Sequence, residues 1–193
     1  MFDFDEQMAV SEQPKVRALI ERALRRRFPD LLAIHKAHDE NDKRGIDYFL
    51  EFKNGRMEAL DVKVRTKDFA RHGDACNVAL ETIANSATGK PGWTFDGDKL
   101  TDWVLFLWLD TERDDLVHFR QLRAAASANV TAWLAARRVA KQTTKTARGS
   151  YSAESLFVSP RDMWSGIYRL FSYAGNPADT PRSPSNAAGR DRT

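Results

Sequence analysis

Residues 45–65 read GIDYFLEFKNGRMEALDVKVR, and this stretch decides the fold. Apolar and polar side chains alternate on both sides of Asn54-Gly55, and Asn-Gly is a pair that tight hairpin turns favour. The stretch therefore predicts two antiparallel strands, 46–52 and 57–65, joined by a turn at 53–56.

The side-chain alternation determines which residues of this hairpin meet. Asp61 and Lys63 share one face of the second strand, because successive side chains of a strand point to opposite sides. The turn is expected to place Ile46 or Asp47, at the start of the first strand, roughly opposite residues 62–63. We therefore expect Asp47, Asp61 and Lys63 to converge on one spot.

Two carboxylates at one spot repel each other, and burying them is costly unless a proton, a cation or strong hydrogen bonds compensate. A hard divalent cation meets this need, because Mg²⁺ prefers oxygen ligands and completes its shell with water and phosphate. Lys63 beside such a cation could orient or deprotonate a bound water and neutralise charge on phosphorus. The pattern predicts a Mg²⁺ site, which Mn²⁺ could also occupy, and phosphodiester hydrolysis. The alternative is an ordinary solvent-facing ion pair between Asp61 and Lys63.

Residues 45–47 (GID), followed after the hairpin by residues 60–63 (LDVK), resemble the signature of the PD-(D/E)XK nuclease superfamily in its Asp-x-Lys form. The predicted order of helices and strands over residues 11–139 is similar to the common core of that superfamily. One departure is Ile46, which stands where the signature has proline.

The resemblance implies a restriction-endonuclease-like fold and assigns roles to four residues. Asp47 and Asp61 correspond to the two acidic positions that bind the metal, and Lys63 corresponds to the catalytic lysine. The main-chain carbonyl of Val62 is the expected further metal ligand. The implied enzyme is a Mg²⁺-dependent endo- or exodeoxyribonuclease, and the alternative is a non-catalytic nucleic-acid-binding or protein-interaction module on the same fold.

Two glutamates are further candidates for the catalytic site. Glu81, on a strand predicted beside Asp61, is either a metal or water ligand or a partner of Lys63 or Arg65. The resemblance also implies a glutamate from the first helix, where Glu21 is the only acidic residue in the middle. A surface pair between Glu21 and Arg25, four residues apart, is the alternative.

Apolar spacing predicts the remaining elements. Helices are expected at 11–28, 120–139 and 160–171, and further strands at 77–84, 103–109 and 116–119. The unbroken apolarity of 103–109 is typical of a central strand covered on both faces. The expected class is α/β, with a central mixed sheet of about five strands flanked by helices in the order αβββ-loop-ββα and a short C-terminal helix. Residues 1–173 form one domain in this interpretation, and 174–193 form a tail with too few apolar groups to order itself.

Charge is unevenly distributed along the chain, although 30 basic and 27 acidic side chains give a net charge of only +3. Residues 116–153 contain no Asp or Glu, and 141–150 are expected to form a mobile basic loop. Such a stripe can bind a polyanion by releasing counterions, or it can be a solvated face. The candidate nucleic-acid-binding residues are Arg65, Lys90, Arg120, Arg123, Arg137, Arg138, Lys141, Lys145 and Arg148. The first helix offers a second candidate patch with Arg22, Arg25, Arg26 and Arg27.

Several classes of protein are excluded by composition. A single cysteine, Cys76, cannot form an internal disulfide or a thiolate zinc cluster. The longest apolar run, 103–109, falls far short of the roughly 20 residues of a membrane span. We therefore expect a soluble cytoplasmic protein with nucleic acid, DNA rather than RNA, as its partner and no membrane contact. A double-strand cut would require two subunits, which leaves a homodimer open, and analogy alone suggests a role in repair, recombination or a mobile element.

Overall fold

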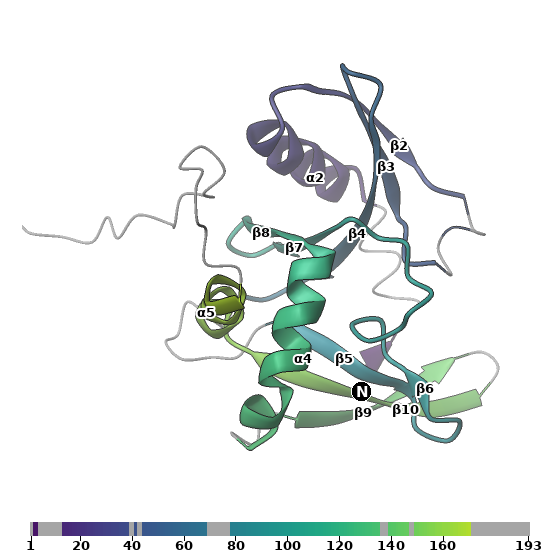
Figure 1. The fold of residues 1–193 in the computed structure, drawn as a ribbon. Coiled ribbons are helices and arrows are strands. Elements are labelled where there is room, and N and C mark those ends of the chain that lie inside the picture. Colours follow the sequence, from purple (N-terminus) through teal and green to yellow (C-terminus); the bar gives the residue numbers. More distant parts are fainter. Residues whose placement is uncertain are drawn as a thin grey trace, which may run out of the picture.

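The computed structural model describes residues 2–3, 13–38, 41, 44–68, 78–135, 139–146 and 149–170 (Figure 1). Its elements are, in chain order, β1 (Phe2–Asp3), α2 (Pro14–Arg27), β2 (Leu31–Lys36), β3 (Tyr48–Phe52), β4 (Met57–Arg65), β5 (Val78–Asn85), β6 (Lys90–Pro91), β7 (Trp103–Trp108), β8 (Arg113–His118), α4 (Phe119–Ala135), β9 (Val139–Thr146), β10 (Gly149–Val158) and α5 (Pro160–Leu170). The α/β class is confirmed. Among the described residues, no helix is both long and apolar enough to cross a membrane.

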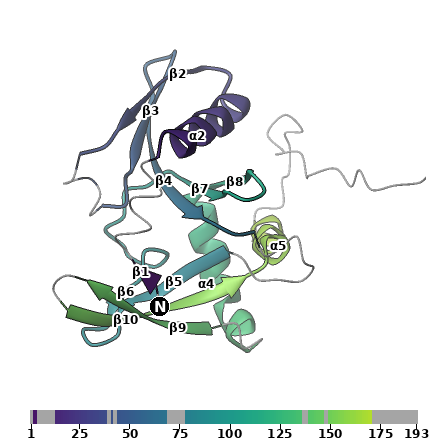
Figure 2. The same ribbon diagram turned by 180° about the vertical axis from the view of Figure 1, so that it is seen from behind.

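The strands form two sheets of five. The first sheet has the order β2-β3-β4-β7-β8, and the second has the order β1-β9-β10-β5-β6. The first sheet is mixed, because β4 and β7 run parallel while its other neighbours run antiparallel. Figure 2 shows the second sheet on the side of β7 and β8 that faces away from α2.

The predicted hairpin is confirmed as β3 and β4. The turn between them contains Gly55, whose φ of +80° lies in the left-handed region that glycine adopts without strain. Tyr48 pairs with Leu60, and this register continues to Asp47 opposite Asp61 and Ile46 opposite Val62. The expected pairing of Ile46 with residue 62 therefore agrees with the register, whereas the alternative, Asp47 opposite residues 62–63, was wrong by one to two residues.

Strand β7 is an interior strand of the first sheet, between β4 and β8, and it is covered on both faces as its apolarity predicted. Its two faces belong to different hydrophobic clusters. Leu105 and Leu107 pack with the buried face of α2, which consists of Val16, Leu19, Ile20, Ala23 and Leu24. Val104, Phe106 and Trp108 pack with residues of β5, β10, α4 and α5. Burying such a side chain stabilises the fold by about 1.5–3 kcal/mol. The second cluster thereby joins the two sheets around β7.

The helix predictions are also confirmed, since α2, α4 and α5 overlap the expected ranges. Helix α4 begins one residue earlier than expected, at Phe119, and ends at Ala135, whereas Val139, the expected end of this helix, begins β9. Helix α2 begins with Pro14, a residue that suits the first turn because its missing N–H would have no partner there. It ends at Arg27, two residues before Pro29. Its apolar stripe faces the first sheet, as the 3.6-residue period requires.

Two expectations about the strands were wrong. Strand β5, predicted beside β4, belongs to the second sheet, and β2 takes up the fifth place in the first sheet. Residues 141–150, expected as a mobile loop, contribute to β9 and β10, which pair antiparallel from Gly149 opposite Thr146 to Leu156 opposite Val139. Alternation predicts that a segment is a strand, but partner choice depends on contacts distant in sequence. The predicted tail at 174–193 lies outside the described residues.

Candidate active site

The chain positions Asp47 by fixing the turn before it. Gly45 has a φ of +75°, and a Cβ there would lie 2.8 Å from the Lys99 side chain and 3.1 Å from the Thr101 hydroxyl. That hydroxyl donates a hydrogen bond to the Gly45 carbonyl. The Asp47 N–H then donates to the Leu60 carbonyl at 2.8 Å, which ties Asp47 to β4. Glycine is required at position 45 for both reasons, its backbone conformation and the close approach of Lys99.

Asp47, Asp61 and Lys63 are brought together by β3 and β4. The Lys63 Nζ lies 2.8 Å from the Asp61 Oδ2, and the Val62 N–H donates to the Asp47 Oδ2 at 2.7 Å. The Asp61 side chain is 7% exposed and that of Lys63 is 29% exposed, so the group is partly open to solvent. The register partners of Asp61 and Lys63 on β7 are Val104 and Phe106, so both side chains point away from α2 and toward the second sheet.

The pKa of Asp47 indicates an excess of negative charge around this carboxylate. Burial, followed by the charge of Asp61, raises the pKa of Asp47 from 3.8 to about 6, although Lys63 and the Val62 N–H oppose this change. One lysine therefore does not compensate two carboxylates in this partly buried place. A bound proton or another cation would relieve the imbalance.

Lys63 remains positively charged. Burial lowers its pKa, but the charges of Asp61, Asp47 and Glu81 and a hydrogen bond to Asp61 raise it more, so its pKa lies above the usual value. A permanently charged ammonium is suited to stabilising negative charge and is a poor general base.

The donor atoms at this place fit a magnesium ion that keeps much of its water. In an extended strand the N–H and the carbonyl of one residue point to the same side. Because the Val62 N–H points at Asp47, the Val62 carbonyl faces the same side and can join Asp47 and Asp61 as a third oxygen donor. Within the described part of the chain, no group of three or more His, Cys, Asp or Glu side chains is arranged to hold a metal. Incomplete protein cages of this kind suit Mg²⁺, which retains several waters.

Glu81 reaches the site from the second sheet, not from a strand beside Asp61 as expected. Its Oε2 accepts the Trp93 N–H at 3.1 Å, and its charge acts on Lys63. The Trp93 ring centroid lies 5.0 Å from the Lys63 Nζ, a cation–π distance. Gly92 makes this possible, because a Cβ there would lie 2.3 Å from the Glu81 carbonyl oxygen. Glu81 thus acts on Lys63 through its charge, more weakly than Asp61 and Asp47 do.

Trp93 packs against Phe106 and Phe119, with ring centroids 6.5 and 6.1 Å away, and it also covers Lys63. Sequence reasoning missed this contact with Lys63, as it missed the anchoring role of Thr101. The Pro91-Gly92 pair before Trp93 was the available signal for a close backbone approach.

Glu21 is not brought to the site. It lies on α2, which packs on the opposite face of the first sheet from Asp61. Its Oε1 is 2.8 Å from the Arg25 Nε, so the alternative of a surface pair describes what the structure shows.

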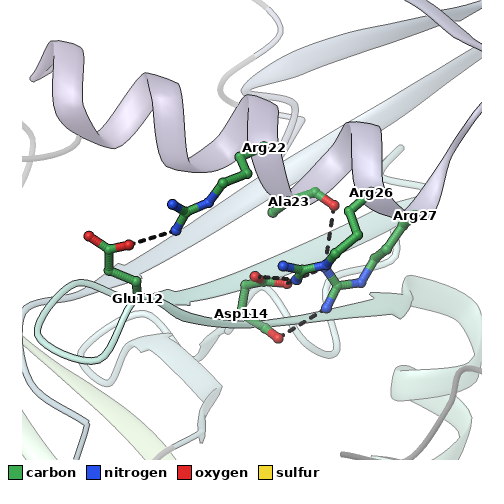
Figure 3. Close-up of polar contacts among 6 residues, drawn as sticks. All are labelled: Arg22, Ala23, Arg26, Arg27, Glu112 and Asp114. Carbon is green, nitrogen blue, oxygen red and sulfur yellow. Dashed lines mark hydrogen bonds and ion pairs between the residues drawn. The ribbon is translucent and has the colours of Figure 1, made fainter.

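The arginines of α2 also have structural partners (Figure 3). Arg22 lies 2.7 Å from Glu112, and Arg26 lies 2.7 Å from Asp114. Arg27 pairs with the Asp114 carboxylate and donates to the Asp114 carbonyl at 3.0 Å. These contacts fasten α2 to the start of β8.

The other basic candidates are spread over several elements. Arg123 donates to the carbonyls of Thr94 and Asp96, which ties α4 to the loop before β7. Arg65 lies on β4 on the same face as Lys63, whereas Lys90 on β6 and Arg120 on α4 are exposed. The structure places Lys141 and Lys145 on β9, while Arg137, Arg138, Arg148 and Cys76 lie outside the described residues.

Comparison with known proteins gives no relative: no family model, no curated protein and no solved structure matches this chain. We therefore infer the function from the residues of β3 and β4 and from the geometry they adopt.

Proposed function

We propose that this protein is a Mg²⁺-dependent nuclease that hydrolyses phosphodiester bonds, with DNA as the expected substrate. The observation that carries the proposal is the placement of Asp47 opposite Asp61 across β3 and β4, with Lys63 2.8 Å from Asp61. Strongly shifted pKa values gather at functional sites, and Asp47 has such a shift.

Asp47, Asp61 and the Val62 carbonyl would hold the metal. When bound, a divalent cation supplies Lewis acidity toward the phosphate and makes a water molecule more acidic. It would also replace the proton that Asp47 takes up near pH 6.

Lys63 would act on the substrate through its charge. Its ammonium can stabilise the negative charge that develops on the phosphoryl oxygens during in-line displacement. Asp61 orients the ammonium from one side and the Trp93 ring covers it from another, so its position is fixed before a substrate arrives. Fixed charges of this kind lower a barrier without reorganisation.

The test is cleavage of supercoiled plasmid and linear DNA by the purified protein with Mg²⁺ or Mn²⁺, and with EDTA. We expect cleavage that EDTA abolishes, and a rate that Asp61→Asn and Lys63→Met each lower by about 10²–10⁴-fold. The matched controls are Asp98→Asn and Lys53→Met, because both residues are exposed and lie outside the site.

Two outcomes would refute the proposal. One is full activity in Asp61→Asn or Lys63→Met, which would place the chemistry elsewhere. The other is absence of cleavage on duplex, single-stranded, branched and RNA substrates by a folded protein. Nucleic-acid binding without cleavage would then favour the non-catalytic module, in which Asp61 and Lys63 form a structural ion pair.

A further inference from the structure

The face of the first sheet that carries the candidate site continues along β3 to an aromatic side chain, Phe49. Side chains two residues apart on a strand point to the same side, so Phe49 shares the face of Asp47, about 6.8 Å further along the strand. On β4, Phe49 pairs with Ala59, which precedes Asp61 by two residues on that same face. Position 49 is therefore a direct neighbour of both carboxylates.

The hydrophobic core does not use Phe49. The side chains that alternate with it along β3, Tyr48, Leu50 and Phe52, pack in the cluster that contains α2, on the opposite side of the sheet (Figure 1). Among the described residues, Phe49 belongs to neither hydrophobic cluster and makes no ring contact. Its side chain is partly exposed, and its neighbour Ala59 adds only a methyl group beside it. Surface of the Phe49 side chain is therefore open to solvent next to the site.

The surroundings of Phe49 suit an uncharged group better than a phosphate. Phe49 pairs with His35 on β2, and the next row of the sheet consists of Ala33, Glu51 and Met57. The His35 Nε2 lies 2.7 Å from the Glu51 Oε2, so the charge of that carboxylate has a partner. Met57 is 51% exposed and extends the apolar surface. These two rows contain no lysine or arginine to bind a phosphate.

A phosphodiester substrate carries a flat, uncharged group close to every phosphate, namely its base. Aromatic side chains stack on the bases of single strands, and the contact accepts any base because each has a π-face. In a duplex the bases are already stacked on one another, so a base reaches a side chain of this kind only after leaving the stack. A single exposed aromatic side chain is ordinary by itself. The position of Phe49 beside Asp47 and Asp61 is what favours a base as its partner.

We propose that Phe49 stacks on an unpaired base of the strand whose phosphate is hydrolysed at Asp47, Asp61 and Lys63. The preferred substrate is then single-stranded nucleic acid, or a strand that is unpaired at the cleaved bond. The choice of a nucleotide as the partner of Phe49 rests on the proposed function, whereas the open aromatic side chain beside the carboxylates does not.

The test is equilibrium binding, measured by fluorescence anisotropy with the full chain in EDTA and repeated in Mg²⁺ with Asp61→Asn protein. The labelled probes are a single-stranded oligonucleotide, an abasic oligonucleotide of the same length, and a blunt duplex of the same sequence. Phe49→Leu, which removes the ring but stays apolar, is expected to weaken binding of the single strand about tenfold. Binding of the abasic strand and of the duplex should not change.

Two further variants sharpen this measurement. Phe49→Trp keeps an aromatic ring and should bind the single strand at least as tightly as the unaltered protein. Phe28→Leu is the matched control, because Phe28 is a partly buried ring that packs on the α2 side of the sheet. The slope of log affinity against log salt should be the same in all these proteins, since none of the changes removes a charge.

The outcomes that overturn the proposal are specific. One is a single-strand affinity of Phe49→Leu protein equal to that of the Phe28→Leu control. Another is equal weakening for all three probes, which would mean that position 49 does not contact a base. A third is the absence of single-strand binding by the unaltered protein under both conditions. Thermal unfolding shows whether each variant is folded.

A measurement on the unaltered protein decides the matter if Phe49→Leu does not fold. Irradiation of the protein with a single strand that contains 5-iodouracil should attach the strand to Phe49, within the tryptic peptide 45–53, as mass spectrometry would show. Attachment only to other peptides would overturn the proposal.

This result is separable from that of the cleavage assay. Single-strand binding that depends on Phe49 in a protein that never cleaves would retain the base contact and remove the nuclease. Cleavage with single-strand binding that is unaltered in Phe49→Leu protein would retain the nuclease and remove the base contact.

Discussion

Two charged regions of the molecule, the α2 arginines and the β3–β4 carboxylates, differ in how their charges are matched. Arg22, Arg26 and Arg27 face Glu112 and Asp114, and the arginine side chains are between 27% and 58% exposed. Asp47 and Asp61 face each other with only Lys63 between them, and burial makes that arrangement costly. The matched charges stabilise a contact between two elements. The unmatched negative charge favours the binding of a cation. Unmatched charge of this kind is typical of binding and catalytic sites.

The largest difference between the α2 arginines and the β3–β4 carboxylates is expected in metal binding. A metal competes with the proton on Asp47, so the apparent affinity for Mn²⁺ should fall by about tenfold for each pH unit below about 6. Isothermal titration with Mn²⁺ at pH 5, 6, 7 and 8 measures this. Arg26→Gln protein should follow the same curve, because its charge is matched elsewhere. Binding that does not change between pH 5 and 8 would contradict the assignment of Asp47 as a ligand.

A smaller effect is expected in the stability of the metal-free protein. Folding raises the pKa of Asp47 from 3.8 to about 6, so the folded state holds this proton more tightly than the unfolded chain does. The stability contribution of the group is fully present below pH 4 and is lost as the pH rises through 6. Asp47→Asn, which stays neutral and can still accept the Val62 N–H, should therefore raise the free energy of unfolding at pH 8 by about 1–3 kcal/mol.

Urea unfolding in EDTA at pH 8 and at pH 4.5 checks this prediction, and the gain should largely disappear at the lower pH. Asp98→Asn is the control, because the exposed Asp98 lies outside the site. A loss of stability at pH 8 would mean that Asp47 is a structural group rather than one kept in place for function.

The smallest effect is expected in the α2 region. Asp114 has a side chain that is 6% exposed and pairs with two arginines, so Asp114→Asn should lower the free energy of unfolding by about 1 kcal/mol. Glu112→Gln should cause no measurable change, because exposed ion pairs contribute little. Neither variant should alter cleavage. A cleavage defect in Asp114→Asn protein of normal stability would show that the α2 arginines take part in substrate binding.

Local signals determined what could be predicted from the sequence. The β3–β4 hairpin follows from Asn54-Gly55 and the alternation around it, and these interactions lie within a few residues of each other. The convergence of Asp47, Asp61 and Lys63 follows from the same hairpin. Helix α2 follows from its apolar period, and β7 from its unbroken apolar run.

Contacts between distant segments could not be predicted in the same way. Glu81 was identified as a candidate, but its sheet was not, because alternation does not specify which strands pair. The pairing of the α2 arginines with Asp114 joins residues 87 to 88 positions apart, and nothing in the local pattern indicates it.

Because Trp93 is hydrogen-bonded to Glu81, the contact between the Trp93 ring and Lys63 depends on both sheets. The acids and the lysine come from the first sheet, whereas the backbone N–H of Trp93, whose indole lies over the ammonium, donates to the Glu81 carboxylate of the second. A fluctuation that separated the sheets would leave the ammonium hydrated and free to rotate. The fluorescence of Trp93 would therefore report separation of the two sheets.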